Sequence, residues 1–175
     1  IPITKEQFIE AGNYLDPINV ETAIQAEAEM KFLFQTIKRN SKPDNQILAI
    51  QRFMALIKGG IFNFMEAKTK LKNLHTGLYS ALTSTKSELI IETCFLLGQI
   101  APCIGTDFDQ VGDYLKPLAF KIGNEVELIS ECCKLAFLAI IENCPSITFF
   151  NSIVDIIRDK GHKQKAVMCE CFCKI

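Results

Sequence analysis

The chain has 175 residues, of which 49% are apolar and 22% are charged, and its formal net charge is −1 at pH 7. This composition is typical of an ordered protein with a large core, and the small net charge argues against bulk attraction to nucleic acid or to an anionic membrane. The longest unbroken apolar run, residues 135–141, is far too short to span a bilayer. We therefore expect neither a nucleic-acid partner nor a membrane partner.

The cysteines and the first residues indicate the cellular setting. The chain begins without the basic start and long apolar stretch of a signal peptide, and without an initial Met, as is typical of a segment of a longer protein. All eight Cys follow position 93, mostly inside apolar helical patterns. We expect reduced, buried thiols in the cytoplasm rather than a disulfide scaffold.

Apolar spacing predicts helices along the chain, and no segment alternates long enough to predict a convincing strand. Two helices are expected around residues 4–15 and 20–39. A third begins near Pro43, which suits a first helical turn, and ends at Gly59 and Gly60. The next helix carries a leucine stripe at Leu71, Leu74, Leu78 and Leu82.

Two later helices begin at pairs with capping-box spacing. Thr85 is followed three residues later by Glu88, and Asn124 is followed at the same spacing by Glu127. In a capping box, the two side chains bond each other's backbone N–H groups at the helix start. The pairs therefore predict helix starts near residues 85 and 124.

Part of the sequence repeats. ELIIETC at residues 88–94 and ELISECC at 127–133 agree at five of seven positions, 39 residues apart, and KAVMCEC at 165–171 follows 38 residues later with a similar small or apolar pattern. Cys94, Cys133 and Cys171 therefore share one repeat position. A helical hairpin that recurs about every 40 residues is typical of HEAT or armadillo-type arrays. We expect an all-α fold, a HEAT-repeat α-solenoid of stacked antiparallel hairpins.

We assign residues 1–175 to a single domain of this type. N-terminal helices are expected in residues 1–40, three units in 41–83, 84–123 and 124–161, and the start of a fourth unit in 162–175.

The closing residues 161–175 hold three alternate cysteines near His162, which suggests a metal or redox site. On a helix, Cys169 and Cys173 share one face, but Cys171 points to the other side because two residues turn a helix by about 200°. No C-x₂-C pair is present to complete a zinc site. The repeat position favours buried structural thiols, and a thiol-dependent metal or redox protein stays as a third hypothesis.

Sequence motifs of catalysis are absent. The chain has no phosphate-binding loop, metalloprotease helix, nucleophile elbow or dinucleotide fingerprint. We therefore expect no enzyme and no cofactor. Helical arrays usually bind a protein partner along an edge or a concave surface.

Three segments, taken in order, resemble the TOG domain of CLASP-type microtubule regulators, a paddle of HEAT units. They are PDNQILAIQRFMALIKGG, STKSELIIETCFLLGQIAPCIGTDFDQVGDYLKPLAFKI and GHKQKAVMCECF. The resemblance runs from about residue 17 to the end. It implies a tubulin-binding module of a CLASP-like regulator of microtubule dynamics, located in the cytoplasm on microtubules and the spindle. In that family, turns inside the hairpin units grip tubulin, and basic groups meet its acidic surface.

The resemblance also places residues on this tubulin-facing edge. Lys86 and Lys163 stand at basic positions of the second and fourth units, where the other interpretation is a solvated loop charge. Pro43 and Gln46 stand where the family has an aromatic residue and an Arg. The expected edge is completed by Lys42, Ser84, Thr85 and Lys165.

The chain also departs from the family pattern. It has no Trp, Glu127 stands near a basic position of the third unit, and Met168 replaces the last Arg. It holds no counterpart of a fifth or sixth unit. Large aromatic and Arg side chains are frequent interface hot spots, each often worth about 2 kcal/mol or more. The alternative function is a HEAT-repeat protein–protein scaffold that has lost tubulin binding and contacts another cytoskeletal protein.

Overall fold

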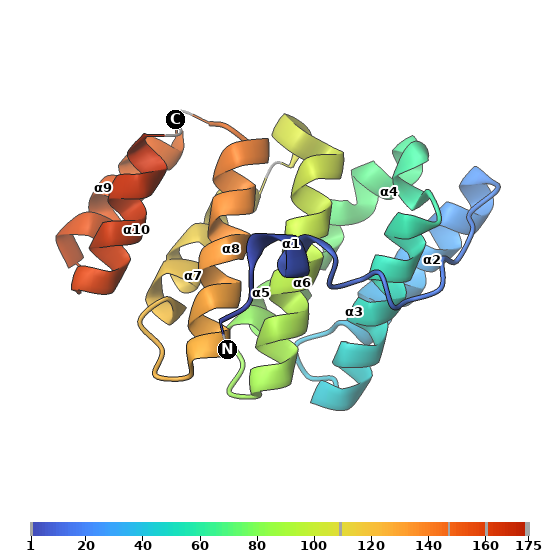
Figure 1. The fold of residues 1–175 in the computed structure, drawn as a ribbon. Helices are drawn as coiled ribbons and strands as arrows, with labels where there is room; N and C mark the ends of the chain where they lie inside the picture. Colours follow the sequence, from blue (N-terminus) through green and yellow to red (C-terminus); the bar gives the residue numbers. More distant parts are fainter. Residues whose placement is uncertain (1, 109, 147, 160, 174–175) are drawn as a thin grey trace.

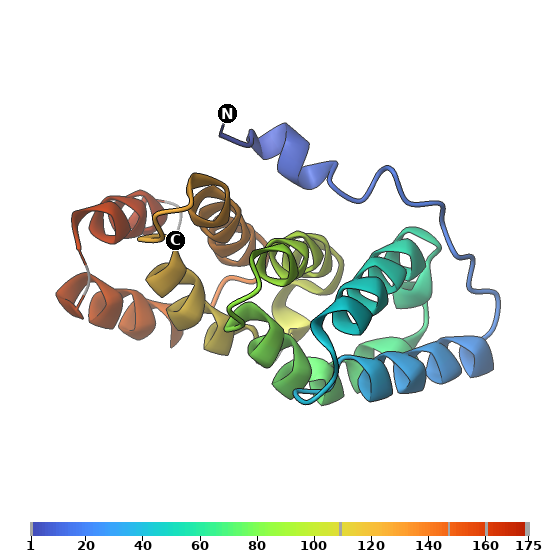
Figure 2. The ribbon, with the colours of Figure 1, turned by 90° about the horizontal axis from the view of Figure 1, so that it is seen from below.

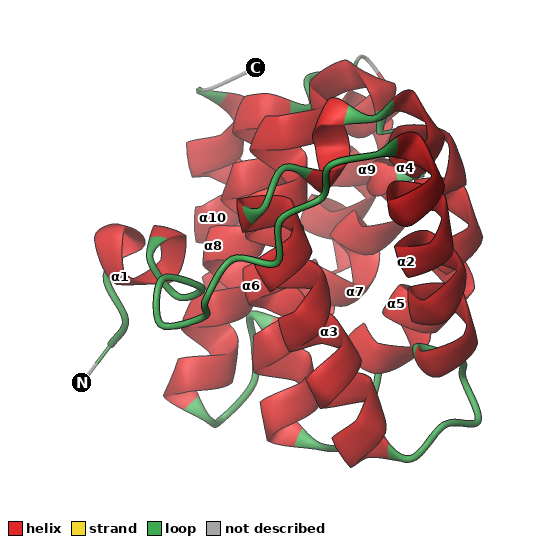
Figure 3. Cartoon of the chain, turned by 90° about the vertical axis from the view of Figure 1, so that its right-hand side faces the viewer, coloured by secondary structure: helices red, strands yellow, loops and turns green. Residues whose placement is uncertain are grey.

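The computed structural model describes residues 2–108, 110–146, 148–159 and 161–173 (Figure 1). Within these ranges the chain is helical or irregular, without strands (Figure 3). The α-helices are α1 (Lys5–Ile9), α2 (Ala23–Thr36), α3 (Pro43–Lys58), α4 (Met65–Lys70), α5 (His75–Leu82), α6 (Ser87–Ile104), α7 (Leu115–Lys121), α8 (Glu127–Asn143), α9 (Thr148–Asp159) and α10 (His162–Phe172). Short 3₁₀ turns, η1 to η4, occupy Ile61–Asn63, Leu71–Leu74, Gly105–Asp107 and Val111–Tyr114.

The helices form two layers (Figure 2). One layer contains α3, α6, α8 and α10, and the other contains α2, α5, α7 and α9. Each helix of the first layer packs against the helix that precedes it in the second layer, and α6 lies between α3 and α8. This stack of antiparallel pairs confirms the expected all-α, HEAT-like array.

Short connections join α2 to α3, α5 to α6, α7 to α8 and α9 to α10. The unit boundaries that we placed after residues 40, 83, 123 and 161 fall in these connections. Each of those units thus begins with the second helix of a packed pair. The division stays a proposal, because a periodic array can be divided at either of its two kinds of connection.

The central helix, α6, is the most apolar long helix. The segment Ser87–Asp107, which comprises α6 and the following 3₁₀ turn, is long and apolar enough to meet the length and composition criteria of a membrane-spanning helix. Half of the stretch that meets these criteria is buried. A helix packed on both sides by other helices needs the same composition. Packing against α3, α5 and α8 accounts for the apolar surface of α6.

The repeat register found in the sequence is confirmed at the contact between α6 and α8. Cys94 and Cys133 are both fully buried, and their Sγ atoms lie 3.7 Å apart. Burial raises the pKa of the Cys94 thiol well above its ordinary value, and the neighbouring Cys133 adds to this effect. The side chain of Cys171 lies outside the described residues.

The third helix agrees closely with the sequence prediction. Pro43 occupies the first position of α3, where its missing N–H costs nothing. The helix ends at Lys58, and Gly60 then adopts a left-handed φ of 90°, which favours glycine. The apolar side chains Ile47, Ile50 and Met54 of this helix are buried.

The leucine stripe is buried as expected, but it does not lie on one helix. The 3₁₀ turn at Leu71–Leu74 separates α4 from α5. This turn bends the chain, so that α4 packs against α2 while α5 packs against α6. The prediction of one continuous helix is wrong because this segment has to contact two different neighbours.

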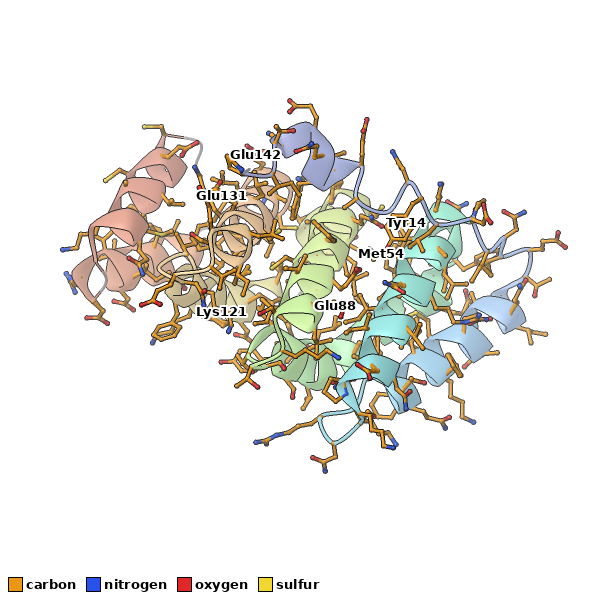
Figure 4. All side chains as sticks on the ribbon, turned by 60° about the horizontal axis from the view of Figure 1, so that its bottom comes forward. Tyr14, Met54, Glu88, Lys121, Glu131 and Glu142 are labelled. Carbon is orange, nitrogen blue, oxygen red and sulfur yellow. The ribbon has the colours of Figure 1, made fainter. Side chains whose placement is uncertain are left out.

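The N-terminal segment lies outside the two layers. Its helix α1 is shorter than the predicted 4–15, and it crosses the outer side of α6 and α8 (Figure 3). Phe8 is buried there against Phe95, with ring centroids 5.5 Å apart. Lys5 pairs with Glu142 of α8, at an Nζ–Oε2 distance of 3.1 Å, and Glu142 lies beside α1 in Figure 4.

Candidate functional site, an edge of loops

Three connections line up along one edge of the array, at the bottom of Figure 1. They are residues 37–42 before α3, 83–86 before α6 and 122–126 before α8, and we call them, with the first turns of these helices, the loop edge. The structure brings five of the predicted site residues together on its first two connections. These are Lys42, Pro43, Ser84, Thr85 and Lys86.

The second and third connections have the same turn. The Lys86 N–H donates to Ser84 Oγ over 3.1 Å, and the Val126 N–H donates to Asn124 Oδ1 over 2.8 Å. Lys86 and Val126 are the N-cap residues of α6 and α8, and neither of these residues caps its helix with a side-chain hydrogen bond. The capping boxes predicted at Thr85 and Asn124 are wrong. The side chains of Ser84 and Asn124 instead accept from the backbone N–H two residues later, in the turn that precedes each helix.

Lys86 is part of an ion pair on the loop edge. Its ammonium forms an ion pair with Asp44, in the first turn of α3. The hydrogen bond that the ammonium donates to the Asp44 carboxylate is the main cause of the raised pKa of Lys86. The side chain of Asp44 is 81% exposed and that of Lys86 is 37% exposed, so both remain accessible to a partner. Asp44 lies 42 positions away along the chain, and no sequence pattern pointed to it.

Gln46 and Met168 require a correction. Gln46 is only 4% exposed, and its Nε2 donates to the Lys38 carbonyl over 2.8 Å, which closes the first connection. Met168 is fully buried in α10. Both side chains therefore have a mainly structural role, although Gln46 also contributes to the lining of a polar hollow beside the loop edge.

The other predicted site residues lie at or near the starts of helices. Lys42, Pro43 and Thr85 are exposed, and Lys42 is the N-cap residue of α3. Lys165 is exposed in the first turn of α10, where its N–H donates to the Gly161 carbonyl over 3.1 Å. The backbone of Lys163 is part of α10, but its side chain lies outside the described residues.

Lys121 joins two connections of the loop edge. It lies in the last turn of α7, and its Nζ donates to the Ser84 carbonyl over 3.4 Å (Figure 4). Lys121 was not among the residues expected from the sequence, although a basic residue at the end of a helix just before a connection was a usable signal. The contact ties the α5–α6 connection to the neighbouring pair of helices.

The charge of the loop edge changes along its length. The first connection carries Lys38, Arg39 and Lys42, all exposed. The third connection and the start of α8 carry the exposed carboxylates of Glu125 and Glu127. The edge is therefore basic at its first connection, close to neutral at the second, where the exposed Glu88 in the first turn of α6 offsets Lys86, and acidic at the third.

A polar hollow of about 900 Å³ opens beside the basic part of the loop edge. Pro43, Gln46, Ser84 and Thr85 contribute to its lining, so the predicted site residues border one continuous depression. Within the described ranges, no three His, Cys, Asp or Glu side chains are grouped closely enough to hold a metal ion.

Stacked helical pairs that present their connecting loops along one edge define a class of proteins, the helical-repeat binding modules. Comparison with known families identifies which one: this chain belongs to the CLASP N-terminal family, which matches residues 25–173. The matched region begins within α2 and includes the whole loop edge. No curated protein sequence gives a significant match to the chain.

Proposed function

We propose that this chain is a tubulin-binding module of a CLASP-like regulator of microtubule dynamics. It acts in the cytoplasm, on microtubules and the spindle, and contacts tubulin through the loop edge. The observation that carries this proposal is the convergence of Lys42, Pro43, Ser84, Thr85 and Lys86 on one exposed edge. Membership of the CLASP N-terminal family supports it.

The contact is centred on the first two connections. Exposed cations there attract an acidic surface, whereas Glu125 and Glu127 at the third connection repel it. Lys163 and Lys165 extend the proposed surface at the start of α10. A contact made by exposed charges weakens as salt rises, because ions screen it.

The pair between Lys86 and Asp44 limits the affinity. A partner carboxylate has to compete with Asp44 for the Lys86 ammonium. The edge also lacks a large aromatic anchor at Pro43, and interface hot spots are enriched in Trp, Tyr and Arg. We therefore expect binding in the micromolar range or weaker, about −8 kcal/mol or less favourable.

The same observations favour a second candidate function. A HEAT-repeat scaffold that contacts another cytoskeletal protein needs neither the aromatic anchor nor an unpaired Lys86. The neutralising carboxylate of Asp44 and the burial of Gln46 are specific features that favour this alternative.

Size-exclusion chromatography with free αβ-tubulin separates the two candidates. The tubulin-binding proposal expects the chain to elute with tubulin when tubulin is present at tens of micromolar, and to elute separately in high salt. If the two elute separately at low salt as well, the tubulin proposal fails and the scaffold is favoured. A pull-down in which tubulin is the dominant specific partner counts against the scaffold.

A further inference from the structure

The polar hollow extends well beyond the loop edge. It runs from the α2–α3 connection across α5 to α7, with Arg39, Tyr79 and Lys116 in its lining. A smaller hollow shares Tyr79 and Lys116 with it and adds Phe120 and Lys121. The two depressions therefore form one surface along the layer of α2, α5 and α7, which is the lower layer in Figure 2.

This surface has an excess of positive charge. Its described lining contains three permanent cations, Arg39, Lys116 and Lys121, and one carboxylate, Asp113. That carboxylate lies 3.3 Å from His75 Nε2, while His75 Nδ1 lies 3.1 Å from the Tyr114 hydroxyl. Asp113 is thus directed to His75 at the floor of the hollow, and the surface favours an anionic partner.

The spacing of the cations indicates what kind of anion fits. Arg39 is in the α2–α3 connection and Lys116 is in α7, with α5 between them. Helices that lie side by side in one layer are about 8–10 Å apart, so two such steps separate the backbones of Arg39 and Lys116 by roughly 16–20 Å. At this separation, a ligand longer than a single phosphate contacts both cations without drawing their side chains inward. An extended peptide advances about 3.3 Å per residue, so five or six residues with carboxylates at each end cover this distance.

The floor between the cations suits a peptide chain. Tyr79 is 40% exposed and Phe120 is 67% exposed, and they offer apolar surface to the aliphatic parts of side chains. Hydroxyl groups of Ser41 and Ser80 line the same surface and can donate to carboxylates or accept from peptide N–H groups, whereas the Thr83 hydroxyl already donates to the Tyr79 carbonyl and can only accept.

We propose that the polar hollow is a docking site for an acidic peptide segment of a partner protein, held between Arg39 and Lys116 and lying along Tyr79. This site adjoins the loop edge, but it does not require that the partner be tubulin. A folded partner held at the loop edge can place an acidic tail here, and linking two contacts raises the overall affinity without new contacts at the edge.

The test uses no tubulin, so its outcome is independent of the tubulin proposal. The probe is a fluorescein-labelled peptide of glutamates with a central tyrosine, and its anisotropy is measured against the whole chain at low salt. We expect saturable binding. The double variant Arg39→Glu/Lys116→Glu is expected to weaken it about tenfold or more, since each exposed charge contact is replaced by repulsion.

The matched control is Lys31→Glu/Lys134→Glu, which reverses two charges that line neither the hollow nor the loop edge. It is expected to bind within about twofold of the unchanged chain. An equal loss of peptide affinity in both double variants would show that the peptide responds only to the net charge of the chain, and it would overturn the proposal. Absence of peptide binding at low salt would also overturn it. Complete competition by millimolar inorganic phosphate would overturn it too, because it would indicate a site for a single anion.

Discussion

Cys94 and Cys133 touch across the α6–α8 interface, with Sγ atoms 3.7 Å apart, although 39 positions separate them in the chain. The two residues occupy equivalent places in consecutive helical pairs, so the contact records the register of the array. Both are fully buried, and a small side chain at each place allows α6 and α8 to approach closely. Cys94 and Cys133, which share their repeat position with Cys171, thus have a packing role.

Thiol labelling tests this role. We expect N-ethylmaleimide to modify the exposed Cys103, Cys169 and Cys173 in the folded chain. The buried Cys94, Cys132, Cys133 and Cys144 should react only after denaturation. Burial raises the pKa of Cys132 to about 12 and that of Cys144 to about 11, so their reactive thiolate forms are scarce at neutral pH. Rapid labelling of Cys94 or Cys133 in the native chain, mapped by mass spectrometry, would contradict the packing role.

Glu92 should make stability depend on pH. Its carboxylate lies between α3 and α6, where Gln51 Nε2 donates to Oε1 over 3.3 Å, and Oε2 is buried without a hydrogen-bond partner in the described structure. Burial raises the pKa of Glu92 above its ordinary value of 4.5. The folded chain therefore disfavours the charged form, and stability falls as pH rises from the unfolded pKa through the folded pKa.

The variant Glu92→Gln removes this cost. We expect it to raise the melting temperature by about 2 °C at pH 7.5, a typical shift for a gain below 1 kcal/mol in a chain of this size. The gain should disappear near pH 4, where Glu92 is protonated in both states. An equal difference at both pH values, measured by thermal denaturation, would show that the carboxylate charge is not the cause.

The N-terminal helix should detach when its anchor is blocked. A Cβ atom on Gly98 would lie 2.4 Å from Phe8 Cε1, so Gly98→Ala forces the ring out of its site. We expect residues 2–20 to lose hydrogen-exchange protection while the core of α6 and α8 keeps it. Ile9→Ala is the control, because Ile9 is 62% exposed on the same helix and its truncation should leave protection unchanged. Retained protection in Gly98→Ala would contradict the anchoring by Phe8.

Features set by neighbouring residues were predictable from the sequence, and features set by distant ones were not. Pro43 and Gly60 determine the ends of α3 locally, and the spacing of Cys94 and Cys133 exposes the repeat. The bend at Leu71–Leu74 depends on two separate packing partners, which apolar spacing along one segment cannot show. The burial of Gln46 and the pairing of Lys86 with Asp44 likewise depend on contacts between elements. Lys42, Ser84 and Thr85 lie on one edge of the array, as the family resemblance implies, and their role in binding stays a prediction.

Asp44 should lower the affinity of the loop edge for an acidic partner. Asp44→Asn removes the carboxylate that pairs with Lys86 and adds one unit of positive charge to the edge. For an acidic partner, we expect affinity to rise about two- to fivefold at low salt, in the range of one exposed charge contact. The increase should vanish at high salt, because the contact is screened. A lower affinity in this variant, measured by microscale thermophoresis, would show that Asp44 itself contacts the partner.

The proposed function rests on one claim, that the basic part of the loop edge binds tubulin. The most direct test is the dissociation constant for free αβ-tubulin, measured for the unchanged chain, for Lys42→Glu/Lys86→Glu and for the control Lys31→Glu/Lys134→Glu, which reverses two charges away from the loop edge. We predict that the edge variant binds at least about tenfold more weakly, while the control stays within about twofold. Equal affinities for the edge variant and the unchanged chain, or no measurable affinity for either, would contradict the claim.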